Sequence, residues 1–428
     1  MQIGHIIKSE RIKKGFKQSY LANGICTPSY LSKIENNQTI PSHEILEMIK
    51  NKLDISFLNL ETEEDEIEVS LRRELFDIYK NITFGRELDY IKAMQKELVE
   101  MRFKYVKKDI YYDYNLVLLR ILLSLNTDYN DIKNCMDQLL HDESDLNITQ
   151  YYLLKKLQGI YHYNSKNSKE SIMHFDEAAH VFSKTSYPEW EKADLNYMRA
   201  LANLSGNRGF DAIKYSEEAF SYFRDKLFFT RAIESLCITG IAYKKLQQSI
   251  DALDIYNKAL EMALKFHLDR YENVLYQNIG SLYSAIGELD KALEYFFKSL
   301  KKKETKEEKL LSIFSIIQVY SKKKDIKRML NWIDKGVEST SNENTLIAYL
   351  YHFKLYEEFF CNHEKINMFF IKEAINFFEE KKDYRHAYKY TIKFADILKR
   401  NKKYKESSIY YEKSIYFKNE NINFWEDL

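Results

Sequence analysis

Glycine and proline are scarce in this chain of 428 residues, which contains 11 glycines and 3 prolines. Because these two residues dominate tight turns and interrupt helices, their scarcity favours long helices joined by short connections. Hydrophobic residues make up 45% of the chain, which is enough for a large core. The composition therefore predicts an all-α protein.

Cysteine clusters and long apolar runs are also missing. The cysteines form no Cys-x-x-Cys pair and have no histidine-rich surroundings at zinc spacing; they are Cys26, Cys135, Cys237 and Cys361. The longest apolar run, Leu116 to Leu125, is interrupted by Arg120 and is too short to cross a bilayer. Residues 1–10 lack a hydrophobic signal region. We expect a soluble cytoplasmic protein without a metal site or a membrane partner.

Motifs of common catalytic sites are missing as well. The sequence contains no GxxxxGK[ST] phosphate loop, no HExxH, no GxSxG and no glycine-rich turn after a strand. We therefore expect neither enzymatic activity nor a cofactor. The net charge is +1, so any surface that binds nucleic acid must be local.

A helical hairpin between Asn273 and Lys302 shows how most of the chain is built. Apolar, aromatic and small residues recur at helical spacing, Gly287 breaks the pattern, and a second helix resumes it. The order, with a small residue at Gly280, an aromatic at Tyr283, Ala292 in the second helix and Phe296 after it, resembles the tetratricopeptide (TPR) pattern. Small residues let the two helices approach closely, and aromatics fill the space between neighbouring hairpins.

The same register returns about every 40 residues toward the N-terminus, for example at Gly240 with Tyr256 and at Ala200 with Ala219. We predict roughly five recognisable repeats and about three further hairpins, which stack into a superhelix with a concave surface lined mainly by first helices. The acidic run Glu61 to Glu68 marks a boundary between the N-terminal residues and the repeats. The expected domains are residues 1–60, a linker helix or hinge over 61–75, and a repeat domain over 76–428.

The segment from Gln18 to Asn37 has the pattern of a helix-turn-helix. Thr27 suits an N-cap, and Pro28 suits the first helical position, where no amide donor is needed. The second helix then exposes short polar and basic groups that can reach bases and phosphates in a major groove. The residues expected to contact DNA are Gln18, Thr27, Ser29, Tyr30, Ser32, Lys33 and Asn37.

An alternative is that these two helices form one more surface hairpin. The order of small, apolar and polar positions argues against it, and so does the local charge. Residues 1–58 contain eight Lys or Arg and five Asp or Glu, a balance of 8 − 5 = +3. Cys26, in the turn, could act as a redox sensor, but a small core residue is the simpler interpretation.

Residues 3–50 resemble the phage-repressor-like (Xre) DNA-binding domain, and the string Ser29-Tyr-Leu-Ser-Lys-Ile-Glu-Asn-Asn37 is similar to the RNPP regulators of Firmicutes. Members of that family, of which the PlcR-like and NprR-like types are nearest in layout, join such a domain to a TPR array that binds a short signalling peptide. The resemblance implies a homodimeric transcription factor on a pseudo-palindromic operator in double-stranded DNA, because two-fold symmetry matches two half-sites.

In this family, asparagines on the first helices of repeats hold the backbone of the peptide. The position that matches is Asn278, and an amide that donates and accepts at once can clamp a peptide unit. In the two preceding repeats that position holds Ile238 and Met198, so either these turns contact side chains or the register is displaced and Asn196 or Asn203 is the clamp. Other residues expected to face the groove are Lys156, Tyr197, Glu234, Lys244 and Gln277.

Peptide binding is expected to change the pitch of the superhelix and so reposition the DNA-binding units. Two other functions remain open. The array could act on a phosphorelay response regulator, as in Rap-like relatives, although those lack the helix-turn-helix. The chain could also be a constitutive repressor, including an antitoxin or immunity repressor, whose repeats serve only for dimerisation or protein binding.

Overall fold

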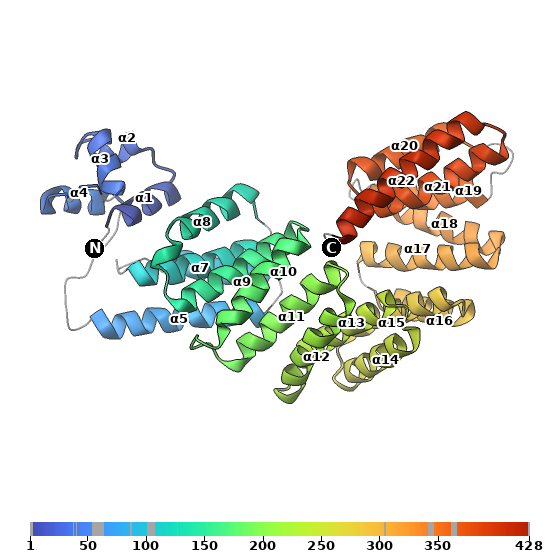
Figure 1. Cartoon of the computed structure of the whole chain (residues 1–428), viewed down its shortest axis with the longest axis horizontal. Coiled ribbons are helices and arrows are strands. Elements are labelled where there is room, and N and C mark those ends of the chain that lie inside the picture. The colour runs from blue at the N-terminus through green and yellow to red at the C-terminus, as the bar shows by residue number, and fades with distance from the viewer. Residues whose placement is uncertain are drawn as a thin grey trace. The chain divides into compact units, whose positions relative to one another are not determined.

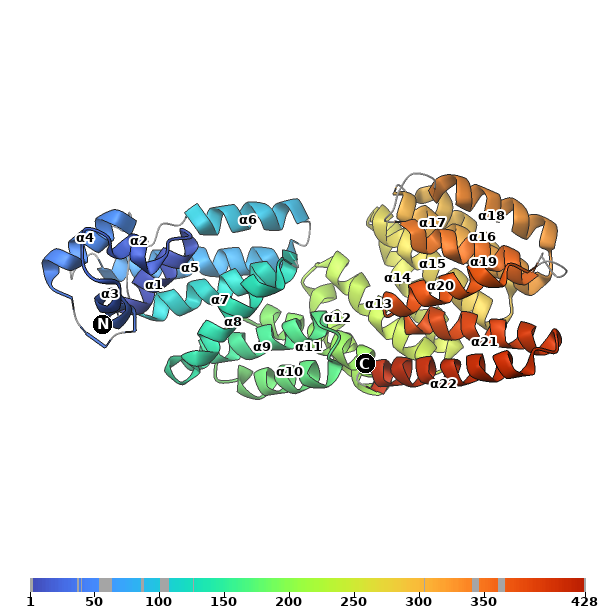
Figure 2. The same cartoon turned by 90° about the horizontal axis from the view of Figure 1, so that it is seen from above.

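The computed structural model of this chain describes residues 3–36, 38–39, 41–53, 64–85, 88–100, 108–125, 127–303, 305–340, 346–360 and 366–426. In these ranges the regular elements are all helical, as the composition predicts, and Figures 1 and 2 show them from two directions. The chain divides into two compact units. Unit 1 comprises residues 1–164 and 177–187, and unit 2 comprises residues 165–176 and 188–428.

Unit 1 begins with four short helices and continues with longer ones. The short helices are α1 (Ile3–Lys13), α2 (Gln18–Ala22), α3 (Pro28–Glu35) and α4 (His43–Leu53). The longer ones are α5 (Glu64–Phe84), α6 (Leu88–Glu100), α7 (Lys108–Leu125), α8 (Tyr129–His141) and α9 (Ile148–Asn164), with the 3-10 helix η1 at Glu143–Asp145. Helix α7 contacts α5, α6, α8 and α9 and is therefore central to this group.

The four short helices of unit 1 enclose a small core of their own, whose buried members are Ile7, Leu21, Ala22, Leu31, Ile34, Ile49 and Leu53. Leu21 and Ala22 come from α2, and Leu31 and Ile34 come from α3. Ala22 is small at the crossing of these two helices, as the sequence pattern predicts. The compact fold of α1 to α4 fixes the orientation of α3, which is the helix expected to meet DNA.

Unit 2 is a stack of antiparallel hairpins. Helix α10 (Ser168–Phe182) belongs partly to each unit, and the helices that follow are α11 (Glu189–Ser205), α12 (Gly209–Asp225), α13 (Phe229–Lys245), α14 (Ser249–Lys265), α15 (Asp269–Ile286), α16 (Leu289–Lys302), α17 (Lys306–Lys323), α18 (Ile326–Thr340), α19 (Ile347–Phe360), α20 (Met368–Glu380), α21 (Tyr384–Arg400) and α22 (Tyr404–Glu426). Each odd-numbered helix from α11 packs against the even-numbered helix that follows it. The first helices also contact one another from hairpin to hairpin, from α11 to α19, as expected for a TPR-type stack.

Glycine at position 280 is required by close packing. A Cβ atom there would lie 2.8 Å from ring atoms of Phe296 on α16, which is too close for two carbon atoms. Gly287, with φ of 90°, then ends α15 in the left-handed conformation that suits glycine. The predicted hairpin is thus confirmed, with its turn at the expected residue.

An ion pair is buried between first helices of unit 2. Arg231 of α13 binds Asp194 of α11, and both side chains are almost fully enclosed. The guanidinium also lies 4.2 Å from the ring centre of Tyr197 and 4.8 Å from that of Phe223. Because removing one member leaves a buried charge unpaired, this pair ties α11 to α13.

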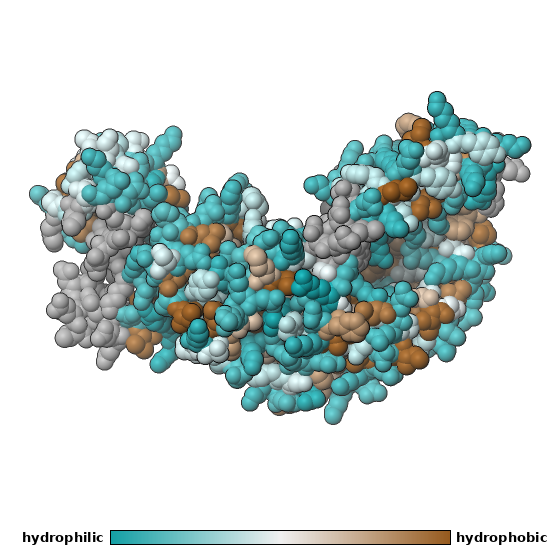
Figure 3. All heavy atoms as spheres, viewed as in Figure 1, coloured by the Kyte–Doolittle hydropathy of each residue, from teal (hydrophilic) through white to brown (hydrophobic). Residues whose placement is uncertain are grey.

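Hydrophilic residues cover most of the face shown in Figure 3, and the hydrophobic residues on it lie in scattered patches. Such scattered patches are ordinary for a protein surface. None of the helices within the described ranges has the length and apolar character needed to cross a bilayer.

Candidate functional site

Helix α3 presents the side chains expected to contact DNA. Its N-terminus is capped by Thr27, whose hydroxyl accepts a hydrogen bond from the Tyr30 amide at 3.2 Å, and Pro28 occupies the first turn. Gly24, with φ of 79°, makes the turn between α2 and α3, a conformation that suits glycine. The cap and the turn predicted from the sequence are therefore present.

The exposure of the predicted DNA-contacting residues is uneven. Thr27, Ser29 and Lys33 are exposed, whereas Ser32 and Tyr30 are half-buried, and the Tyr30 ring packs against the small core. Ser29 and Lys33 are four residues apart and therefore lie on one face of α3, one turn from each other. Asn37 lies outside the described residues. The surface that α3 offers to a groove is thus centred on Ser29 and Lys33.

A buried ion pair holds α3 to α1. The guanidinium of Arg11 donates to both carboxylate oxygens of Glu35, at 2.6 and 2.9 Å, and also donates to the Phe16 carbonyl at 2.9 Å. Gln18 donates to the same carboxylate at 2.7 Å. This bidentate geometry fixes the angle of α3 within the four-helix domain. This pair was not predicted, although each of the two helices has a charged residue among the apolar positions of its inward face.

The contact of Gln18 with Glu35 changes how this residue is interpreted. One of the two N–H groups of its side-chain amide is occupied inside the domain, so only the other is available to a phosphate. Burial raises the pKa of the Cys26 thiol, which lowers its reactivity as a thiolate. The small-residue interpretation of Cys26 fits this environment better than redox sensing does.

Asn278 lies on α15 and is half-buried. Its side-chain amide forms no hydrogen bond to another of the described residues, whereas both the nitrogen and the oxygen of the neighbouring Gln277 side chain are hydrogen-bonded. Gln277 donates to Ser315 at 2.8 Å and accepts from Ser312 at 2.8 Å and Lys303 at 3.3 Å. Asn278 therefore has donors and acceptor available for a peptide unit, while Gln277 joins α15 to α17.

Four residues expected to face the groove are buried instead. Lys156 is 0% exposed, and its ammonium donates to the Tyr79 hydroxyl at 3.0 Å inside unit 1. Tyr197 is covered by Arg231, Asn196 donates to Glu218 at 2.8 Å, and Asn203 donates to the Arg199 carbonyl at 2.9 Å. The prediction that these four side chains are exposed was wrong, because neighbouring helices pack against the first helices on both sides.

The sequence left open whether Ile238 and Met198 contact the side chains of a peptide or whether a neighbouring asparagine is the clamp, and the structure answers this in part. Ile238 is buried, while Met198 is half-buried. A displaced register with Asn196 or Asn203 as the clamp is not supported, since both amides are hydrogen-bonded within unit 2. Asn278 therefore remains the asparagine of the predicted set that is available to a ligand.

Glu234 and Lys244 lie on α13 and are half-buried. Glu234 accepts from the Tyr271 hydroxyl at 2.8 Å and pairs with Arg231 at 3.5 Å. Lys244 donates to Ser281 of α15 at 2.7 Å. Burial lowers the pKa of Lys244, and the charges of Arg385 and Lys322 lower it further. A cationic side chain next to other cations is suited to bind an anionic group.

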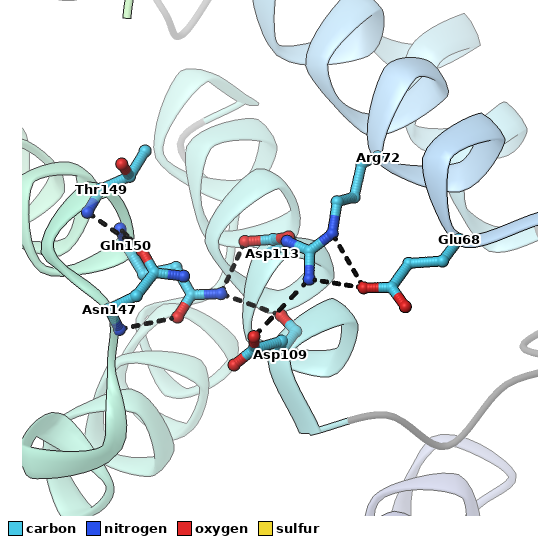
Figure 4. A network of polar contacts seen from close by, with 7 residues as sticks. All are labelled: Glu68, Arg72, Asp109, Asp113, Asn147, Thr149 and Gln150. Carbon is cyan, nitrogen blue, oxygen red and sulfur yellow. Dashed lines mark hydrogen bonds and ion pairs between the residues drawn. The ribbon is translucent and has the colours of Figure 1, made fainter. Parts of the chain in front are cut away.

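A polar network in unit 1 holds the first long helix after the four-helix domain (Figure 4). Arg72 of α5 pairs with Glu68 at 3.0 Å, with Asp109 at 3.6 Å and with Asp113 of α7. Gln150 of α9 donates to Asp113 at 2.7 Å. This network was not predicted, since its members come from three helices that are distant along the chain.

The network also includes the N-terminus of α9 and borders a cavity. The Asn147 side chain accepts from the amides of Thr149 and Gln150, and Gln150 accepts from the Asn147 amide in return, which is a capping box. Arg72, Asp113 and Gln150 are among the residues lining a cavity of about 420 Å³. Because these polar groups satisfy one another, we interpret the network as a structural tie between α5, α7 and α9.

The likenesses to known proteins agree with this architecture. A helix-turn-helix family model matches residues 7–60, and a tetratricopeptide repeat model matches residues 274–302, the hairpin of α15 and α16. The transcriptional activator NprA of Geobacillus stearothermophilus is 26% identical, over 94% of this chain and 100% of its own. The response regulator aspartate phosphatase A of Bacillus subtilis is 26% identical, over 49% of this chain and 54% of its own.

Solved structures resemble the fold over most of the chain. The apo form of the quorum sensor NprR from B. thuringiensis matches with a TM-score of 0.68 and 19% identity, covering 83% of this chain and 99% of that one. NprR in complex with its cognate peptide NprX matches with a TM-score of 0.56 and 20% identity, covering 85% of this chain and 100% of that one. At this level of identity the likeness concerns the fold alone.

Proposed function

We propose that this chain, which belongs to the RNPP family of peptide-sensing regulators, is a DNA-binding transcriptional regulator gated by a short signalling peptide. The observation that carries the proposal is the capped helix-turn-helix in a chain whose remaining helices form TPR-type hairpins. The whole-length relative NprA is a transcriptional activator, and NprR has been solved with a cognate peptide.

The DNA-binding part is residues 1–60 in this proposal. Helix α3 enters a major groove with Ser29 and Lys33 on its exposed face, and the Arg11–Glu35 pair holds its angle. A homodimer would place two such helices on the two half-sites of a pseudo-palindromic operator in double-stranded DNA. Because its target is DNA, we place the protein in the cytoplasm, and we propose no enzymatic activity for it.

The peptide-binding part is the repeat domain, residues 76–428, joined to the DNA-binding part by a linker over residues 61–75. Asn278 clamps the peptide backbone through its available amide. Peptide binding favours one arrangement of the repeats over another, and the shift in operator affinity cannot exceed the difference in peptide affinity between the two arrangements. A coupling energy of about 1–3 kcal/mol is sufficient for such regulation.

The test begins with selection of bound sequences from random double-stranded DNA by the full-length protein. We expect a pseudo-palindromic sequence to be enriched and bound by a dimer. The double variant Ser29→Ala/Lys33→Ala should lose about tenfold or more in affinity for that sequence. The matched control is Lys301→Ala, which removes an exposed lysine of α16 in unit 2. If no sequence is enriched, the proposal is wrong.

Peptide gating is tested with short synthetic peptides encoded near the gene, measured by their effect on operator binding and by direct binding. Asn278→Ala should weaken direct binding by about five- to thirtyfold, since one or two hydrogen bonds are lost. Asn401→Ala, an exposed asparagine after α21, is the control. A protein that binds its operator regardless of every peptide would be a constitutive repressor.

One observation favours a second function. The B. subtilis relative that matches about half of this chain is a response regulator aspartate phosphatase. A repeat domain of this type could therefore also bind a response regulator. Co-purification with response regulators from the same cell, compared between the unchanged chain and Ser29→Ala/Lys33→Ala, separates this function from DNA binding, because binding of a response regulator should survive the loss of operator binding.

A further inference from the structure

Five cationic side chains gather on first helices of unit 2. They are Lys244 of α13, Lys322 of α17, and Arg385, Lys389 and Lys393 of α21. Lys244 experiences the charges of Lys322 and Arg385, and Lys389 experiences those of Lys322, Arg385 and Lys393. Three helices that are far apart in the sequence therefore bring their cations into one region, which we call the cationic cluster.

The cationic cluster has no carboxylate of its own. Among the described residues, none of its five members forms an ion pair. Lysines on second helices differ: Lys298 pairs with Glu294 at 2.7 Å, and Lys413 pairs with Glu379 at 2.7 Å. Like charges that face each other without a counter-charge oppose folding, so the cluster is unexplained as a stabilising feature.

Neutral groups hold the cluster in position. Lys244 donates to the Ser281 hydroxyl at 2.7 Å, and Lys322 donates to the Ser284 carbonyl at 2.7 Å, both on α15. Lys389 donates to the Tyr356 hydroxyl of α19 at 3.0 Å. Each ammonium has three donors, so these hydrogen bonds leave donors available for an anion.

Aromatic rings lie directly beside the cations. The Lys393 ammonium is 4.4 Å from the ring centre of Phe360, and Lys389 is 5.4 Å from that of Tyr356. Phe360 is half-buried, so part of its ring can contact a ligand. An anion bound here would therefore have an apolar neighbour, which suits an acidic group of a peptide next to a hydrophobic side chain.

The cluster adjoins the proposed backbone clamp. Ser281, which holds Lys244, follows Asn278 by three residues on α15, so the two side chains lie on the same face about one turn apart. A peptide held at Asn278 thus has the cations within reach of its neighbouring residues.

We infer that the ligand of unit 2 is an acidic peptide, and that Lys244, Lys322, Arg385, Lys389 and Lys393 bind a carboxylate of it. The inference rests on the proposed function and specifies its ligand class. Lys389 and Lys393 bind the carboxylate most directly, because the cation–aromatic contacts orient both ammonium groups. The carboxylate belongs either to the C-terminus of the peptide or to an aspartate or glutamate side chain.

The test uses three pools of synthetic heptapeptides with the full-length protein. One pool carries Asp or Glu and a free C-terminus, the second carries Asn or Gln and an amidated C-terminus, and the third carries Lys or Arg and an amidated C-terminus. Mass spectrometry identifies the retained peptides. We expect the acidic pool to be retained about tenfold or more over the neutral pool, with little retention of the basic pool.

Variants connect the preference to the cluster. Lys389→Gln/Lys393→Gln should abolish the acidic preference, whereas Lys399→Gln, at an exposed position of the same helix, should keep it. Circular dichroism spectra of all variants check that the helices are intact. Resynthesis of a retained peptide with either its C-terminus amidated or its acidic side chains replaced by amides identifies which carboxylate binds.

The outcomes separate this inference from the proposed function. Equal retention of the acidic and neutral pools, with binding still lost in Asn278→Ala, would overturn the acidic ligand and leave peptide gating intact. An acidic preference that survives Lys389→Gln/Lys393→Gln would also overturn the assignment to this cluster. Retention of no peptide from any pool would overturn the acidic ligand and peptide gating together, while operator binding is tested separately.

Discussion

His352 lies inside the C-terminal hairpins of unit 2, among aromatic rings. Its Nδ1 atom is 2.5 Å from the Tyr390 hydroxyl, and its ring stacks on Phe314 and Phe378 at 4.5 and 4.8 Å between centres. Burial lowers its pKa well below 6.5, the charges of His386 and Lys389 lower it further, and that of Asp383 opposes them. The folded protein therefore holds this imidazole neutral.

This residue predicts a dependence of stability on pH. Because the pKa of His352 is lower in the folded than in the unfolded protein, the unfolded protein binds more protons below pH 6.5, and acid destabilises the fold. The free energy of unfolding should fall as pH decreases, by at most about 1.4 kcal/mol per pH unit from this residue. Urea unfolding between pH 7.5 and 5 measures it.

The matched comparison is between His352→Gln and His180→Gln, which replaces an exposed histidine. His352→Gln should flatten the pH dependence, while His180→Gln should retain it. Asp383 does not titrate between about pH 5 and about 7.5. Burial raises its pKa, but the hydrogen bond and charge of His386 outweigh burial and keep its pKa below 3.8. Equal pH slopes in the two variants would contradict the assignment.

At the scale of single residues, the sequence predicted local features better than exposure. The Thr27 cap and the Gly287 turn were predicted because each depends on a few neighbouring residues. The burial of Lys156 and Asn196 was not predicted, because it depends on the helices on both flanks of the first helix. The Arg11–Glu35 pair was missed for the same reason, since its members are 24 residues apart.

The helices of unit 2 end in a repeated backbone conformation. Left-handed residues occur at Asn207, Leu227, Gln247, His267 and Gly287, at intervals of 227 − 207 = 20 residues. Glycine occupies this position after α15, whereas the other four carry side chains. Because a side chain makes the left-handed conformation unfavourable by about 1–2 kcal/mol, these turns are sites of local strain.

Leu227 offers a test of that strain. Its side chain is 70% exposed, so replacing it removes little buried apolar surface. Leu227→Gly should raise the free energy of unfolding by about 0.5–1 kcal/mol, which is the relief of strain less the entropy that glycine loses on folding. Leu227→Ala removes the same side chain but keeps a Cβ atom, and it should not stabilise the protein. A lower stability of Leu227→Gly than of Leu227→Ala in thermal unfolding would refute this explanation.

The register of the repeats was predictable at the scale of elements, because each hairpin carries its own pattern of small and aromatic residues. Gly280 beneath Phe296 is the clearest example. Residues 345–380 have a blurred register in the sequence, yet α19 and α20 form there. Their core contains Phe353, Ile371 and Phe378, and Phe353 packs against Gly336 of α18, so a small residue beneath an aromatic ring is present there although the register is blurred.

For the whole molecule, charge is distributed unevenly despite a net charge of +1. The four-helix domain has an excess of cations, and the cationic cluster of unit 2 is another local excess. Binding of DNA by the first region releases counterions, so operator affinity should fall steeply as salt rises.

Lys33 predicts part of that salt dependence. Each phosphate contact adds about 0.9 to the slope of log affinity against log salt concentration. A dimer carries two copies of the residue, so Lys33→Ala should lower the slope by about two if Lys33 contacts a phosphate in each half-site. The slope can be measured by fluorescence anisotropy with a labelled operator, at salt concentrations from about 50 to about 300 mM. A slope equal to that of Lys301→Ala would show that Lys33 does not contact phosphate.

The regular interval of the left-handed turns also bears on how a gene for such a protein can change. Asn207 and Gln247 are 247 − 207 = 40 positions apart and have the same left-handed conformation, so the 40 residues that begin at Asn207 form a block between two equivalent turns. Duplication or loss of that block joins one left-handed turn to an equivalent one and leaves the stacking of first helices continuous. Recombination can therefore lengthen or shorten the stack by one whole hairpin without creating a new junction.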